Sequence, residues 1–327
     1  MKLGMIARCD DRGLGAQTRE FYDHMKPDVT VVVDMTPVTK ARWPQHFDWY
    51  PDGIVSPWKG HANPLTDEAL KALASCDIVF SAETFYDPRL PQWLHDRNVR
   101  TVLQPNPELY RDEAPSELWW PTRWLTDKLP KGRVMPVPIP DNQIAEKPAG
   151  EGLLLHVGGW KALADRNGAQ FLPWLIGRTD HRWRITSQSG LRLTPNMRRR
   201  VEPVGHVENR WDLYNDCSVL VMPRRYGGLC LPVLEAMARG MAVVMTDCEP
   251  NREWPIVPVD AGPGAMVGMT LGPIQVRNCD LHDLVWKIEH TLDHLDEYQT
   301  ASLVWARQQA WSVWEPKYRA AMEALLE

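Results

Sequence analysis

Short apolar runs alternate with amphipathic stretches along most of the chain. This alternation predicts βαβ units and mainly parallel sheets. In the first half, five apolar runs read as strands: Lys2–Arg8, Val29–Asp34, Asp77–Ser81, Arg100–Leu103 and Val134–Pro138. Two amphipathic stretches read as helices between them, Gln17–Met25 and Asp67–Ala74.

The second half repeats this pattern after a proposed linker, Ala145–Gly152. Its expected strands are Leu153–Val157, Trp183–Ser187, Val219–Met222 and Ala242–Thr246, with a helix near Ala169–Ile176. The tail Asp283–Glu327 reads as helical, with a break near Trp311–Pro316. We therefore predict an α/β chain of two Rossmann-like, doubly wound domains, residues 1–147 and 148–305. A C-terminal helix, residues 306–327, would cross back to the first domain.

Composition narrows the function classes only slightly. A length of 327 residues suits two domains. A net charge of −5 argues against a protein held on nucleic acid by bulk charge alone. The six cysteines contain no CxxC pair, which is typical of reduced thiols in a cytoplasm. The sequence shows no signal segment and no apolar run long enough to span a bilayer, so we expect a cytoplasmic protein without membrane insertion.

The stretch from Pro223 to Glu253 combines a strand end, a glycine loop and a helix that contains an acid. Gly227 and Gly228 form the loop, proline is well tolerated at the start of the helix, and Glu235 lies about one turn in. Backbone N–H groups and a carboxylate at one crevice suit a nucleotide diphosphate, whose ribose offers two hydroxyls. The alternative is a buried acid that only caps its own helix.

The run GGLCLPVLEAMARGMAVV resembles the signature of family-4-type retaining glycosyltransferases of the GT-B fold. The similarity extends upstream to Leu155–Gly159 and Val204–Val207, and it covers most of Leu153–Glu327. It implies two domains with a cleft between them, the second holding a nucleotide-sugar. The residues that it assigns to this donor are Gly158, Gly159, His206, Val207, Gly228, Leu229, Cys230, Leu231 and Glu235.

The sequence departs from the family pattern at two charged positions. The first glutamate of the paired-acid motif falls on Gly227, while the second, which contacts the ribose, falls on Glu235. The arginine of the upstream loop falls on Gly159. A cation is needed to stabilise a leaving diphosphate, because no metal motif is evident. We assign this role to Lys161 and Arg166, with Arg224 and Arg225 in reserve. A Walker-type phosphate loop is absent.

A second glycine turn follows the first strand. Gly13 and Gly15 would let the backbone approach a phosphate or an acceptor, although Thr18 breaks the GxGxxG pattern and an ordinary β–α turn is the alternative. Glu83, just after the strand Asp77–Ser81, is a candidate to orient an acceptor hydroxyl; His61 and His156 are weaker candidates. The sequence also contains two tryptophan-rich loops, Arg42–His61 and Glu117–Trp124. Their tryptophans would either stack on ligands or, more simply, pack between domains.

The resemblance implies a metal-independent, retaining transfer that uses a UDP-sugar as co-substrate, with no tightly bound cofactor. Ile6–Pro27 and PRRYGGLCLP also look like short glycosyltransferases of tailed bacteriophages, which would act in the host cytoplasm. Two acceptors follow from that likeness, a hydroxymethylated pyrimidine in DNA or a virion protein. The basic run Arg198–Arg200 would attract a phosphate backbone, but the acidic excess of the first half disfavours DNA. The alternatives are a sugar-nucleotide epimerase and a non-catalytic nucleotide-sugar-binding protein. The sequence does not indicate an oligomeric state.

Overall fold

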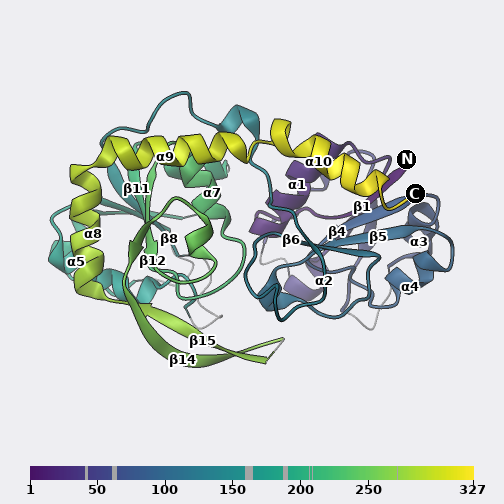
Figure 1. The fold of residues 1–327 in the computed structure, drawn as a ribbon, viewed down its shortest axis with the longest axis horizontal. Helices are drawn as coiled ribbons and strands as arrows, with labels where there is room; N and C mark the ends of the chain where they lie inside the picture. The colour runs from purple at the N-terminus through teal and green to yellow at the C-terminus, as the bar shows by residue number, and fades with distance from the viewer. Residues whose placement is uncertain are drawn as a thin grey trace. The chain divides into compact units, whose positions relative to one another are not determined.

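The computed structural model describes residues 1–40, 43–60, 65–158, 165–186, 191–205, 207, 209–270 and 272–327. They form two compact units (Figure 1). Unit 1 comprises Met1–Val137 together with Trp311–Glu327, and unit 2 comprises Pro138–Ala310. Each unit is built around its own open sheet of parallel strands.

The sheet of unit 1 has seven strands in the order β3-β2-β1-β4-β5-β6-β7. Their bounds are β1 Leu3–Arg8, β2 Val29–Asp34, β3 Ile54–Pro57, β4 Ile78–Ala82, β5 Arg100–Gln104, β6 Glu117–Trp120 and β7 Arg133–Val134. The helices of this unit are α1 Gly13–Met25, α2 Thr36–Thr39, α3 Asp67–Leu73, α4 Leu90–His95 and α10 Trp311–Glu323, with short 3₁₀ turns at Phe47–Trp49 and Pro107–Leu109.

Both faces of this sheet are covered, which explains why its strands read as nearly continuous apolar runs. Leu3 and Met5 of β1 join one buried cluster with Phe21 of α1 and Trp311 of α10. Ile6 points to the opposite face and packs with residues of α3 and α4. The alternation of β1 side chains thus divides the core into two layers.

The sheet of unit 2 has six strands in the order β10-β9-β8-β11-β12-β13. Their bounds are β8 Leu153–Val157, β9 Trp183–Thr186, β10 Val201–Val204, β11 Cys217–Met222, β12 Ala242–Thr246 and β13 Val257–Val259. The helices are α5 Leu172–Arg178, α6 Pro195–Arg198, α7 Leu231–Ala238, α8 Leu281–Asp293 and α9 Leu295–Gln308, with 3₁₀ turns η3 Asp141–Gln143, η4 Ala169–Phe171, η5 Arg210–Tyr214 and η6 Asn251–Glu253. Apolar residues of α7 cover one face, and those of α5 and α8 cover the other.

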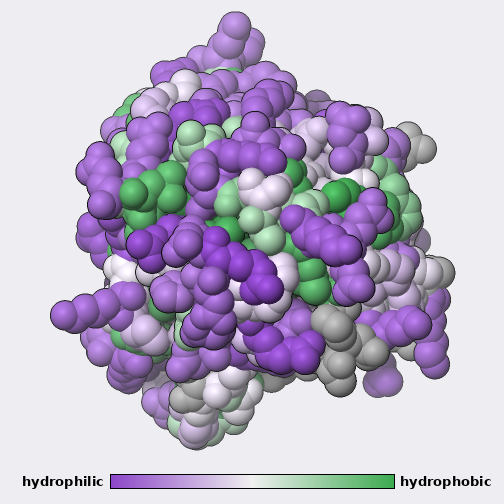
Figure 2. Space-filling view, turned by 90° about the vertical axis from the view of Figure 1, so that its right-hand side faces the viewer, coloured by the Kyte–Doolittle hydropathy of each residue, from purple (hydrophilic) through white to green (hydrophobic). Residues whose placement is uncertain are grey.

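The predicted fold class, two Rossmann-like and doubly wound α/β units, is confirmed by these two sheets. Trp119 and Trp120, from the second tryptophan-rich segment, belong to strand β6 and are buried in the core of unit 1. The side of unit 1 that faces the viewer in Figure 2 is mostly hydrophilic, with small groups of hydrophobic residues between the polar ones.

Three expectations need correction. The strand expected at Val134–Pro138 shrinks to Arg133–Val134, because Pro136 and Pro138 have no N–H to donate to a neighbouring strand. Helix α1 begins at Gly13, four residues before its expected start. Pro316 lies inside α10, and the break in the tail falls between α9 and α10, ahead of Trp311.

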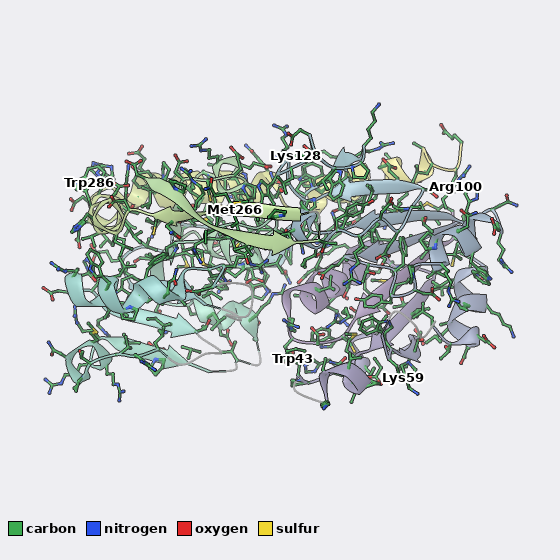
Figure 3. All side chains as sticks on the ribbon, turned by 90° about the horizontal axis from the view of Figure 1, so that it is seen from below. Trp43, Lys59, Arg100, Lys128, Met266 and Trp286 are labelled. Carbon is green, nitrogen blue, oxygen red and sulfur yellow. The ribbon has the colours of Figure 1, made fainter. Side chains whose placement is uncertain are left out.

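The antiparallel hairpin of β14, Ala261–Met269, and β15, Gly272–Cys279, has no counterpart in the sequence prediction. It projects from the body of unit 2 (Figure 1), and Met266 lies on it with 58% of its surface exposed (Figure 3). Its glycines and prolines read as loop from local propensity, because such residues weaken a strand. The pairing of two such strands overrides that preference.

Candidate functional site

Two groups of the predicted donor residues, Gly158 and the segment from Gly228 to Glu235, follow neighbouring strands of the unit 2 sheet. Strands β8 and β11 are neighbours, and the chain leaves them in opposite directions, β8 toward β9 and β11 toward β12. Such a switch point leaves a crevice at the carboxyl ends of the strands, where open α/β sheets bind ligands. Gly158 follows β8 directly, and the glycine loop follows β11.

The glycine loop is held in shape by a buried arginine. Arg224 is 1% exposed. Its Nε donates to the carbonyl of Tyr226 at 3.0 Å, and its Nη2 donates to that of Leu229 at 3.0 Å and of Gly228 at 3.4 Å. The Arg224 guanidinium, a second-choice candidate for binding a diphosphate, is therefore occupied by bonds to the loop carbonyls. Arg224 fixes where the loop amides point.

Gly227 adopts a φ of +115°, a backbone conformation that residues with a side chain rarely take. A glutamate at this position would strain the loop. The glycine found in place of the expected first acid therefore fits the backbone conformation of this loop.

The first turn of α7 follows the loop. Cys230 is its N-cap residue and is buried, while Leu231 is half-buried at the first helical position. The first N–H groups of a helix have no intrahelical acceptor, and the helix dipole adds partial positive charge there. The predicted segment from Gly228 to Leu231 therefore presents backbone donors at the crevice.

Glu235 is buried in α7, with 8% of its surface exposed. Its Oε1 accepts a charged hydrogen bond from Nε of Arg210 at 2.7 Å, and its Oε2 accepts from the Tyr214 hydroxyl at 2.5 Å. Burial, reinforced by the Glu235 carboxylate, raises the pKa of Tyr214 well above its usual value. The phenol thus stays protonated and continues to donate at physiological pH.

Arg210 and Tyr214 lie on η5, a short turn after β10, and sequence reasoning did not assign either of them to the site. A carboxylate has about four lone-pair positions, so the two bonds leave acceptor capacity on Glu235. In the sequence, Arg210 and Tyr214 stand out only as a polar and an aromatic residue four positions apart, ahead of β11. That signal does not identify a partner 21 to 25 residues away.

The loop that contains Arg166 packs directly against the start of the glycine loop. A Cβ on Gly168 would lie 2.2 Å from the carbonyl oxygen of Pro223, so only glycine allows this approach. The Arg166 carbonyl accepts from the amide of Arg225 at 2.8 Å. The Arg225 side chain, in turn, donates to Asn278 of the hairpin at 2.8 Å. Arg166 is thereby placed beside the crevice by its own backbone.

Three predicted residues, Gly159, Lys161 and His206, lie outside the described residues, as does the weaker candidate His61. Val207 is half-buried beyond the end of β10. His156 is fully buried in β8, where its Nδ1 meets the carbonyl of Val221 at 2.9 Å. Burial lowers the pKa of His156 to about 4, so this histidine is a neutral structural group of the sheet.

The predicted residues of the first half also gather at a switch point, between β1 and β4 of unit 1. Gly13 and Gly15 lie in the first turn of α1, so the predicted glycine turn is in fact the start of a helix. A Cβ on Gly15 would lie 1.9 Å from the carbonyl oxygen of Asp10. Gly15 therefore lets the helix approach the strand end closely.

Glu83 directly follows β4 and is half-buried. It takes a φ of +69°, and Tyr86 in the same turn takes +65°. Glu113 holds this turn, because its carboxylate accepts from the Thr84 hydroxyl at 2.5 Å and from the Phe85 amide at 2.7 Å. Backbone conformations of this kind persist only where neighbouring groups enforce them, and they gather at functional sites.

The described residues give little support for a metal site or for a membrane-spanning helix. They contain no group of three or more histidine, cysteine, aspartate or glutamate side chains arranged to hold a metal ion. Within the same residues, no helix is both long and apolar enough to cross a membrane. The six cysteines, all described, are free and buried.

Known proteins resemble this chain in part of its sequence and in its fold. Residues 149–288, inside unit 2, match the family model described as Glycosyl transferases group 1. No curated protein sequence matches the chain significantly.

Several solved structures share the fold over nearly the whole length. HepE of Anabaena in complex with UDP-glucose has a TM-score of 0.71 at 12% identity, covering 99% of this chain and 100% of that one. A glycosyltransferase from Rickettsia africae has a TM-score of 0.66 at 11% identity, covering 99% and 98%. Sucrose-phosphate synthase from Thermosynechococcus elongatus has a TM-score of 0.64 at 14% identity, covering 98% and 99%. At these identities the likeness establishes the fold.

Proposed function

We propose that this chain is a GT-B glycosyltransferase that moves a sugar from a UDP-sugar to an acceptor hydroxyl. The observation that carries the proposal is the meeting of Glu235, the glycine loop and the start of α7 at the switch point of unit 2. This cluster falls within residues 149–288, which match the glycosyltransferase family model. HepE, which shares the fold, was solved with UDP and with UDP-glucose, and this supports a uridine donor.

The donor would bind to the domain that the sequence predicts at residues 148–305, which lies within unit 2. Glu235 would accept hydrogen bonds from the ribose hydroxyls, and the amides from Gly228 to Leu231 would meet the diphosphate. Arg210 and Tyr214 would keep the carboxylate oriented, since both already donate to it. Val207 and His206 would lie toward the nucleotide, and Gly158 and Gly159 would line the crevice from the β8 side.

Departure of the diphosphate needs positive charge near its oxygens. Arg166 would supply it, because its backbone is fixed beside the glycine loop. Lys161 would supply a second cation, and the start of α7 would add its dipole. The chemistry would then rest on positioning and charge stabilisation, with no enzyme nucleophile and no metal.

The acceptor would enter from the N-terminal domain that the sequence predicts at residues 1–147, most of which belongs to unit 1. Glu83 would orient its hydroxyl. Gly13 and Gly15 would allow the start of α1 to approach the donor phosphates. A phosphate oxygen of the leaving group would take the acceptor proton on the face where the bond breaks. The configuration at the anomeric carbon would therefore be retained.

A hydroxymethylated pyrimidine in DNA and a virion protein both remain acceptors of this proposal, as the likeness to bacteriophage enzymes suggests. DNA would require exposure of the base and would show an affinity that falls steeply with salt. A protein acceptor would show little such dependence. Transfer assays at two salt concentrations separate them.

The experiment that tests the proposal is a thermal-shift screen of UDP, UDP-glucose and other sugar nucleotides, followed by calorimetry. A ligand that binds only the native state raises the melting temperature. Glu235→Ala should weaken UDP binding roughly 10- to 100-fold, the effect of losing hydrogen bonds to a charged group. Glu289→Gln is the matched control, because Glu289 is half exposed and pairs with His181 away from the crevice. Equal UDP affinity of wild type and Glu235→Ala would refute the assignment.

Two rival functions give different results in the same system. An epimerase would convert a UDP-sugar with no acceptor present. A non-catalytic binding protein would hold the donor tightly and release no UDP with any acceptor. Because Gly227 stands where an acid was expected, the non-catalytic binding protein is retained as an alternative.

A further inference from the structure

A cavity of about 320 Å³ opens at the β9–β10 edge of unit 2. Its walls come from the two strands, from α6 and from the segment before α6; the lining residues are Ile185, Leu191, Leu193, Arg198, Val201 and Pro203, with Val204. The volume falls at the lower end of the range for small-molecule sites. None of the residues proposed for the donor or the acceptor lines it.

The segment around this cavity is strongly basic. Residues 178–204 contain seven arginines and two acids, Asp180 and Glu202, in a chain whose net charge is −5. Both acids are already engaged: Glu202 pairs with Arg184 at 3.0 Å and Asp180 with Arg200 at 3.3 Å. The other five arginines therefore add positive charge that no acid of the segment balances.

Two arginines of the segment stabilise the fold through bonds to backbone carbonyls. Arg184 also donates to the carbonyls of Leu213 and Asn215, and Arg200 donates to those of Thr179 and Ile176. Arg198 differs from them because it lines the cavity and is exposed. Its Nε donates to the carbonyl of Leu193 at 3.2 Å, which keeps the guanidinium at the rim. Arg198 belongs to the basic run Arg198–Arg200, which the sequence predicts to attract phosphate.

The lining determines the class of ligand. Six of its seven residues are apolar, and none is aromatic. Bases of nucleic acids are held mainly by aromatic stacking, so these walls suit a flexible hydrocarbon better than a base. A guanidinium at the mouth of an apolar cavity matches an anionic head on such a chain.

We propose that this cavity binds an anionic amphiphile, with its hydrocarbon chain between Leu193 and Val201 and its phosphate or carboxylate head on Arg198. This site is independent of the proposed transfer reaction. The same head and chain occur in a free alkyl phosphate and in a membrane lipid, and the experiment distinguishes these two sources.

The test uses the full chain and monomeric decyl phosphate, with inorganic phosphate and phosphatidylglycerol vesicles as parallel probes. Calorimetry should show decyl phosphate binding at one site per chain, with no measurable binding of inorganic phosphate. Added vesicle binding would identify a membrane lipid as the source, and its absence would identify a free amphiphile. Vesicle binding without decyl phosphate binding would overturn the proposal, because it would reflect surface charge alone.

Variants locate the site. Arg198→Gln should weaken decyl phosphate binding at least tenfold, and Leu193→Trp should abolish it by filling the cavity. Arg182→Gln is the matched control, because it removes the same charge from the basic segment without touching the lining. Val204→Phe repeats the filling test if Leu193→Trp fails to fold. Equal losses in Arg182→Gln and Arg198→Gln, or displacement of decyl phosphate by UDP, would overturn the proposal.

Discussion

At the residue scale, Gly227 shows how one backbone angle shapes the crevice. Its φ of +115° suits glycine and strains any residue with a Cβ. A glutamate at this position, which the resemblance to glycosyltransferases led us to expect, therefore conflicts with the loop. The Arg224 contacts with the loop carbonyls depend on the loop conformation that this angle permits.

We expect Gly227→Glu to lower the free energy of unfolding by about 1–3 kcal/mol, the usual effect of a forced backbone conformation. Chemical denaturation measures this change. Gly262→Glu is the control, because its Cβ would meet nothing within 4 Å and its φ is not positive. Equal stability of Gly227→Glu and wild type would show that the loop adopts another conformation without difficulty.

Tyr214 provides a second prediction at this scale. Its hydroxyl donates to Glu235 inside the core, and the raised pKa keeps that proton in place. Tyr214→Phe should reduce the free energy of unfolding by about 1–3 kcal/mol, because a buried carboxylate loses a donor. Denaturant titration checks this. Tyr298→Phe, which loses a hydroxyl contact with half-buried His290, should change stability less; a larger loss in the control would argue against the buried bond.

At the element scale, the two parallel sheets place the ends of β1 and β4, and of β8 and β11, where their switch points form crevices. The same sheets bury polar groups that the packing must satisfy. His156 in β8 is satisfied only in part, since its Nδ1 meets the Val221 carbonyl of strand β11 while its buried Nε2 has no hydrogen-bond partner among the described residues.

Because His156 is buried with a lowered pKa, we expect the free energy of unfolding to decrease on acidification. Its folded-state pKa is about 4, below the unfolded value of about 6.5. Between these values the unfolded chain binds more protons, so the free energy of unfolding rises with pH in this window and falls as pH drops through it. The full effect is on the order of 3 kcal/mol.

Denaturant titrations between pH 7 and pH 4 measure this slope. His156→Gln should flatten it, because glutamine still donates to the Val221 carbonyl and does not titrate in this range. His95→Gln, at an exposed position on α4, should keep the wild-type slope. An unchanged slope in His156→Gln would assign the acid sensitivity to other groups.

At the scale of the whole molecule, the chain builds unit 1 from both of its ends. Helix α10 belongs to this unit, and Trp311, Tyr318 and Met322 lie in its core. The Tyr318 hydroxyl also donates to the Pro136 carbonyl at 2.9 Å and accepts from Gln104 at 2.8 Å. The last seventeen residues therefore complete a core that begins at Leu3.

Deletion of residues 311–327 should destabilise unit 1 far more than unit 2. Hydrogen exchange resolved by peptide should show β1, β4 and β5 losing protection while β8, β11 and β12 keep theirs. Removal of Leu326 and Glu327 alone is the control, because both are exposed. Equal loss of protection in the two units would show that they unfold as one.

The sequence alone determined the features that are encoded within a few neighbouring residues. The apolar runs predicted most central strands, and the glycine loop followed by Leu231-Pro232 predicted the start of α7. Edge elements such as β10 and the β14–β15 hairpin escaped prediction, because their prolines and glycines disfavour strands locally.

Only the tertiary structure decided which side chains meet. Glu235 is joined by Arg210 and Tyr214, Arg224 turns inward to the loop carbonyls, and Arg198 faces a cavity. Local patterns reflect backbone preferences and the direction of burial, and they carry no information about partners on distant elements. Those partners are selected by packing, because a buried polar group is far more stable with a complementary group within hydrogen-bonding distance.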